Sequence, residues 1–248
     1  ALPIYHATAA SPLRLRAKPA STASSARVSR SSGAFHSRGA GAIGATAAYG
    51  LAQGARAFRG RDLAKFQSHV ATVFTTLAEA RPTAVDPVNA MKGLLRAMEA
   101  GGRVEECQEI AVREAEAFAR ADVDHCRAIG EHGCDLIRDG MTVLTHCNAG
   151  WLAFVDVGSA TAPIYAAHAA GRKFTVFCDE TRPRCQGASL TAWELGKHGV
   201  AHTVVADNAG GHLMQRGLVD LCIVGTDRVT RAGDVANKIG TYLKALAA

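Results

Sequence analysis

The sequence predicts an α/β protein, with a helical N-terminal domain followed by a Rossmann-like parallel sheet that carries helices on both faces. In the first part, apolar residues recur every three or four positions, the period of a helix with one buried side. From about residue 141, short and almost wholly apolar segments alternate with helical ones, as in a parallel sheet covered on both faces. We therefore expect a low-complexity segment over 1–36, a helical domain over 37–122 and a Rossmann-like domain over 123–248.

The pattern is helical from Arg38 to about Asp122, and three segments show it clearly. The stretch 41–56 is small and Ala-rich, 62–80 has apolar residues at helical spacing, and 87–101 repeats that spacing. Between the last two, Pro82 and the turn residues around it interrupt the helical pattern.

The sheet region contains four candidate strands, over 142–147, 173–179, 201–207 and 219–225. Helical segments are expected near 159–170, 186–198 and 209–217, with a final helix that begins near 236. Parallel sheets bind ligands outside the carboxyl ends of their strands. Polar pairs stand at these ends: Cys147 and Asn148, Asp179 and Glu180, Asp207 and Asn208, Asp227 and Arg228. They predict one polar crevice, although for Asp207 and Asn208 we favour helix capping.

The charge distribution argues against nucleic acid as a partner. The formal net charge is +6, but residues 1–61 hold nine Lys or Arg and no acid, which leaves 19 basic and 22 acidic residues in the remainder. No apolar run reaches the roughly 18 to 20 residues of a membrane span. The composition is that of a soluble globular protein.

The basic N-terminal segment allows two interpretations. Arg-rich, Ser-rich and acid-poor N-termini resemble organellar transit peptides, and the alternative is a disordered segment. We expect a cytoplasmic protein, or an organellar one if the segment is a transit peptide.

The seven cysteines include no CxxC pair, so the spacing predicts neither a disulfide framework nor a zinc site. We expect a reducing compartment, no metal, and mostly buried thiols. There is no GxGxxG or Walker motif, so no nucleotide is implied and no cofactor is expected.

Positive groups suggest an anionic ligand. Arg38 precedes the small residues Gly39 and Ala40, Arg81 lies in a proline-stiffened turn, and Lys238 is near the start of the last helix. Each alone is more typical of a surface charge. Converging on one crevice, they would form a site for a phosphorylated substrate.

Successive motifs resemble one family. "SRGAGAIGATAAYG", "RPTAV", "LTHCNAG", "DETRPRCQGASLTAWEL", "ADNAGGHLMQRGLVDLCIVGTDR" and "GDVANKIGTYLKAL" are similar, in order, to the S-methyl-5-thioribose-1-phosphate isomerases of methionine salvage. These belong to a superfamily with ribose-1,5-bisphosphate isomerase and the regulatory subunits of translation initiation factor eIF2B. The resemblance runs from Arg38 to the end of the chain.

The resemblance implies an aldose-ketose isomerase that converts S-methyl-5-thioribose 1-phosphate to the 1-phosphate of S-methyl-5-thioribulose. By motif, Asp227 matches the proton donor and Cys147 its partner in hydrogen transfer, by an enediolate-like path or a hydride shift. For this work we expect burial to raise the pKa of the carboxyl group and a nearby positive group to lower that of the thiol. The implied substrate-binding residues are Arg38, Gly39, Ala40, Arg81, Gln186, Asn237 and Lys238.

Three further expectations follow from the resemblance. Alternative functions are a ribose-1,5-bisphosphate isomerase and a non-catalytic regulatory subunit, although regulatory members lack the Cys and Asp combination. A homodimer is the expected assembly. Residues 1–36 do not resemble the family, and family members continue past the "NKIGTY" helix, so we expect the C-terminal part of the sheet domain to be missing here.

Overall fold

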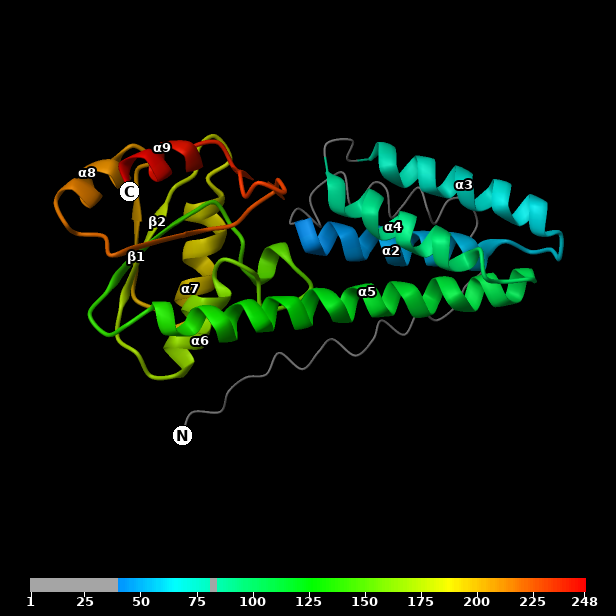
Figure 1. The fold of residues 1–248 in the computed structure, drawn as a ribbon, viewed down its shortest axis with the longest axis horizontal. Helices are drawn as coiled ribbons and strands as arrows, with labels where there is room; N and C mark the ends of the chain where they lie inside the picture. Colours follow the sequence, from blue (N-terminus) through cyan, green and yellow to red (C-terminus); the bar gives the residue numbers. More distant parts are fainter. Residues whose placement is uncertain (1–39, 81–83) are drawn as a thin grey trace.

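The computed structural model describes residues 40–80 and 84–248 (Figure 1). A group of helices lies at one end and a helix-covered sheet at the other, and one long helix runs along both. Among the described residues, no helix is long and apolar enough to cross a membrane.

The helical end consists of α2 (Ala40–Ala57), α3 (Leu63–Glu79), α4 (Val85–Met98) and most of α5 (Val104–Gly133). Asp62 is the N-cap of α3, and its side chain accepts a hydrogen bond from the Lys65 backbone N–H at 3.0 Å. The apolar stripes of the four helices form one core, with Leu51, Met91 and Ala111 fully buried. The C-terminal part of α5 packs against α6 at the sheet end, so this helix connects the two ends of the molecule.

The sheet end contains four parallel strands in the order β3-β2-β1-β4. The strands are β1 (Thr142–His146), β2 (Thr175–Asp179), β3 (His202–Val205) and β4 (Leu221–Val224). The helices are α6 (Ala162–Ala169), α7 (Ala192–His198), α8 (Ala209–Gln215) and α9 (Thr241–Ala247). Short elements are the 3-10 turns η2 (Cys134–Leu136) and η3 (Trp151–Ala153), the π-helical turn η4 (Gly187–Thr191), and the strands β5 (Arg228–Val229) and β6 (Val235–Ala236).

Alternation along the strands places helices on both faces. Val143 and Val176 point to one face, where they pack with Ile164 of α6 and Leu195 of α7. On the other face, Leu144 lies against α8, and α8 and α9 are in contact (Figure 1). The predicted architecture is confirmed.

The details depart from the sequence prediction in two places. The final helix begins at Thr241 instead of near 236, because the antiparallel hairpin β5–β6 and its following turn occupy the residues before it. The predicted domain boundary after residue 122 lies within α5, so the division into domains stays a prediction.

Candidate active site

Cys147 follows β1 directly, in a backbone conformation that few non-glycine residues adopt. Its φ is 68°, in the left-handed region. The Cys147 N–H donates to Thr181 Oγ1 at 2.8 Å, and its carbonyl accepts from Thr191 Oγ1 at 2.7 Å. Strained residues persist where the surroundings fix them, and they cluster at functional sites. At Cys147 the hydrogen bonds of two buried threonines, Thr181 and Thr191, fix the backbone.

The loop after Cys147 is held by the fully buried carboxylate of Glu194 on α7. Glu194 Oε1 accepts from Asn148 Nδ2 and from the Leu152 N–H, both at 3.0 Å. Glu194 Oε2 accepts from the Trp151 N–H at 3.1 Å and from the Tyr165 hydroxyl at 2.7 Å. Four donors therefore satisfy one buried carboxylate, and together they define the path of the segment 148–152.

Asp227 lies at the carboxyl end of β4, which pairs in parallel with β1. Cys147 and Asp227 therefore both follow the carboxyl ends of strands, as predicted, and the structure adds that the two strands are neighbours. Unlike Cys147, Asp227 is exposed, and its N–H donates to the Ala236 carbonyl across the β5–β6 hairpin at 2.9 Å. The turn after this hairpin carries Asn237 and Lys238, both half-buried.

The charges of Lys238 and Asp227 both act on the Cys147 thiol. The pKa of the Cys147 thiol is raised above its ordinary value, first of all by burial. A hydrogen bond from the Asn148 backbone and the charge of Lys238 act to lower this pKa, whereas the charge of Asp227 raises it further. Lys238 and Asp227 thus lie near enough to Cys147 to act on it.

Two expectations about this pair are corrected. The pKa of the thiol is raised instead of lowered, because the loss of solvent around Cys147 outweighs the positive charge of Lys238. The burial expected of the Asp227 carboxyl is not found, because the hairpin that carries it is exposed on both strands.

Gln186 stands where the helical segment after β2 begins, as predicted, and it is half-buried. The next five residues form the π-helical turn η4, a feature that is frequent at functional sites. Gly187 packs so closely on β2 that a Cβ there would lie 1.7 Å from the Asp179 carbonyl oxygen. Only glycine allows this approach.

The sequence predicts that the other polar strand ends open into the same crevice, but in the structure they do not. Asp179 is fully buried and pairs with Lys244 Nζ at 2.9 Å and His146 Nδ1 at 2.7 Å. The carboxylate of Asp207 accepts from the backbone N–H groups of Thr181 and Arg182 at 2.8 and 2.7 Å, so it caps a neighbouring loop instead of its own helix. Asn208 does occupy the N-cap position of α8, but its side chain makes no capping bond.

The buried cluster has the composition of a cation site, since ring and carboxylate atoms of His146, Asp179 and Asp207 lie within 4.8 Å of one another. The ammonium group of Lys244 contacts both Asp179 Oδ2 and the Asp207 carbonyl oxygen. Lys244 thus supplies a positive charge to the buried Asp179 carboxylate.

Part of the predicted substrate site lies outside the described residues, namely Arg38, Gly39 and Arg81. Ala40 is the first residue of α2. All seven cysteines are free. Cys107, Cys126 and Cys178 are buried, whereas the expected burial is wrong for Cys134, Cys185 and Cys222, which are partly exposed, as Cys147 is.

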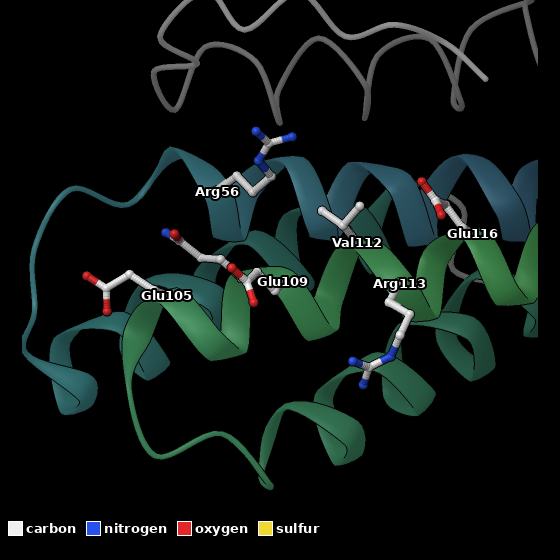
Figure 2. Close-up of a pocket in the computed structure, with 7 residues that line it drawn as sticks. Arg56, Glu105, Glu109, Val112, Arg113 and Glu116 are labelled. Carbon is white, nitrogen blue, oxygen red and sulfur yellow. The ribbon is translucent and has the colours of Figure 1, made fainter. Parts of the chain in front are cut away.

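A separate hollow of about 490 Å³ lies between α2 and α5 (Figure 2). It contains none of the predicted site residues, and its lining is Arg56, Glu105, Gln108, Glu109, Val112, Arg113 and Glu116. Three carboxylates beside two guanidinium groups do not favour an anion. The hollow is therefore not a second candidate for the phosphate.

Sequence reasoning missed the residues that support the site: Thr181, Thr191, Glu194 and Lys244 have no predicted role. One signal was present, because Glu194 interrupts the apolar stretch "TAWEL" of a helix that covers the sheet. A carboxylate at such a position has to be paired or hydrogen-bonded.

The fold defines a class, α/β proteins in which a helical region precedes a Rossmann-like parallel sheet. Residues 36–248 match the initiation factor 2 subunit family. The chain belongs to this family.

Two curated relatives are named as isomerases. The methylthioribose-1-phosphate isomerase of Acidiphilium cryptum is 58% identical over 85% of this chain and 57% of its own length. That of Rhodospirillum centenum is 58% identical over 85% of this chain and 56% of its own length. The chain thus spans little more than half the length of these relatives.

Solved structures of both branches share the fold. The 5-methylthioribose 1-phosphate isomerase of Pyrococcus horikoshii has a TM-score of 0.81 and 36% identity, over 90% of this chain and 63% of that one. The delta subunit of translation initiation factor eIF-2B from A. fulgidus has a TM-score of 0.77 and 41% identity, over 90% and 65%.

Proposed function

We propose that the intact protein is an aldose-ketose isomerase that converts S-methyl-5-thio-α-D-ribose 1-phosphate to S-methyl-5-thio-D-ribulose 1-phosphate in L-methionine salvage. The observation that carries the proposal is the position of Cys147 and Asp227 after the paired parallel strands β1 and β4, with the charge of Lys238 acting on the Cys147 thiol. High identity to named isomerases supports it.

The reaction needs an acid, because the phosphorylated anomeric hydroxyl prevents spontaneous opening of the sugar ring. Asp227, exposed and therefore accessible to a ligand, is the proposed proton donor to the ring oxygen. Cys147 is the proposed partner in the transfer of hydrogen from C2 to C1. Because its pKa is raised, the thiol is the dominant form before substrate binds.

Binding groups are proposed around this pair. Lys238 and Asn237 would contact the phosphate, and Gln186 would bond a sugar hydroxyl. Arg38, Gly39, Ala40 and Arg81 are proposed to complete the site. We further propose a homodimer in the cytoplasm, with light scattering of the purified protein as the test of the dimer.

Two substitutions test the reaction. Cys147→Ala and Asp227→Asn should each reduce kcat by about 100-fold or more, the usual contribution of a general acid or base. Matched controls are Cys134→Ala, another partly exposed cysteine, and Asp234→Asn, another exposed carboxyl on the same hairpin. Normal turnover by both site variants, with the sugar phosphate as substrate, would contradict the proposal.

The path of the hydrogen is tested in D₂O. An enediolate path that exchanges its proton with Cys147 should place solvent deuterium at C1 of the product. A hydride shift should leave C1 free of deuterium, and Cys147 would then act only on the oxygens.

Two other functions compete. Likeness to the A. fulgidus subunit favours a non-catalytic regulatory role, and it predicts no turnover of any sugar phosphate. Ribose 1,5-bisphosphate carries a second phosphate where the thioether stands, so its pocket needs added positive charge. Parallel assays of both sugars separate the three functions.

A further inference from the structure

The side chain of His146 joins the strand that carries Cys147 to the segment that carries Lys238. His146 is the last residue of β1 and its side chain is only 1% exposed. Its Nε2 lies 2.8 Å from the carbonyl oxygen of Ile239, the residue after Lys238. Its Nδ1 lies 2.7 Å from Asp179 Oδ2.

Both ring nitrogens face acceptors. A backbone carbonyl can only accept, so Nε2 donates a hydrogen bond to Ile239, while Nδ1 faces the Asp179 carboxylate. Asp179 also pairs with Lys244, and an Asp207 carboxylate oxygen lies 3.9 Å from Nδ1, so the ring is held between two strand ends and α9.

Gly240 fits this arrangement. Its φ is 106°, in the region that favours glycine, and a Cβ there would lie 2.8 Å from atoms of the His146 ring. The backbone of 239–240 therefore lies directly on the ring and requires a residue without a side chain. Asn237 and Lys238 come immediately before this contact, and the Asn237 amide donates to Thr241 Oγ1 at 3.1 Å.

We infer that His146 is a positioning residue that holds the segment 237–240 against the strand end of Cys147 and so fixes Asn237 and Lys238 for the phosphate of the substrate. This inference rests on the proposed function. Buried ion pairs add little net stability, and their established use is to fix one geometry. The cluster below the site serves that purpose, with Asp179 and Lys244 orienting the ring.

The test uses His146→Phe in the intact protein, which keeps a buried ring but removes both ring nitrogens. KM for S-methyl-5-thioribose 1-phosphate should rise about tenfold, as expected for one lost hydrogen bond to a binding segment, with a smaller change in kcat. Amide hydrogen exchange should become faster over 237–241. His146→Gln, which keeps one donor, should recover part of the loss.

The matched control is His69→Phe, because His69 Nε2 also lies within hydrogen-bonding distance of a backbone carbonyl, that of Gly54 at 3.0 Å, but in the helical region. In this variant neither KM nor hydrogen exchange over 237–241 should change. If His146→Phe does not fold, Gly240→Ala disturbs the same contact from the other side and should also raise KM. Unchanged KM and unchanged exchange in the folded variants overturn the inference. Exchange does not depend on turnover, so an inactive wild type contradicts the proposed function while exchange still decides on the His146 contact.

Discussion

The two sides of the candidate site are built differently. On the Cys147 side, buried Thr181, Thr191 and Glu194 bond the backbone and side chains of the loop after β1. On the Asp227 side, the hairpin β5–β6 is exposed, with Val229 and Val235 more than half accessible. A hydrogen bond inside the protein is electrostatically stronger than one in water, and an unpaired buried donor is costly. The position of Cys147 is therefore fixed, whereas that of Asp227 depends on a small two-stranded hairpin.

This difference suggests a division of labour. The fixed side would hold the group that exchanges hydrogen, which needs precise placement. The open side would admit the substrate and supply the proton. Substitutions that remove hydrogen bonds from the Cys147 side, or a charge from the Asp227 side, test this difference.

The largest effect is expected for Glu194→Ala. It removes the acceptor of four hydrogen bonds, from Asn148, Trp151, Leu152 and Tyr165, so the free energy of unfolding should fall by about 3 to 4 kcal/mol. Urea unfolding measures the change. Glu106→Ala is the control, because that exposed carboxylate bonds only its neighbours in sequence and its loss should matter little. Equal stability of both variants would show that the Glu194 bonds do not hold the loop.

A smaller effect is expected for Thr191→Val, which has the same shape but no hydroxyl. It removes the bond to the Cys147 carbonyl and the one from Asn148, so unfolding free energy should fall by about 1 to 2 kcal/mol. Thr72→Val on the exposed side of α3 removes a bond within the helix and should change it far less. The same unfolding experiment compares the two, and a reversed order would contradict the asymmetry.

The smallest effects concern the reactivity of the thiol. Because the pKa of Cys147 is raised above its ordinary value of 9.0, alkylation should be slow at neutral pH and should accelerate as the pH rises past that value. Lys238→Gln removes a charge that lowers the pKa, so alkylation at fixed pH should slow. Asp227→Asn removes one that raises it, so alkylation should become faster. Each change should be small, because burial and not these two charges is the largest cause of the raised pKa.

Peptide mapping by mass spectrometry follows Cys147 alone. Cys178, whose pKa burial raises to about 12, is an internal reference that neither substitution should affect. If both substitutions changed the alkylation rate of Cys147 in the same direction, Lys238 and Asp227 would not act on Cys147 as opposite charges.

Much of the fold could be predicted because its signals are local. The apolar strands and the change from helical to alternating rhythm mark the architecture, and the strand ends mark Cys147 and Asp227 as candidates. The strand order that makes β1 and β4 neighbours was not predicted, because it depends on how the whole sheet assembles. The supports of the site could not be predicted, because Glu194 meets Asn148 and Trp151 only after α7 packs on the sheet. The pKa of Cys147 was predicted in the wrong direction because burial depends on the whole fold.

The central claim is that Cys147, Lys238 and Asp227 form one substrate site, and protection of Cys147 tests it most directly. The intact protein is alkylated near pH 9 with and without a saturating equilibrium mixture of S-methyl-5-thioribose 1-phosphate and its ketose. The account predicts that the mixture slows alkylation of Cys147 at least about tenfold and leaves that of Cys134 and Cys222 unchanged. Equal rates for Cys147 with and without the sugar phosphates would contradict it.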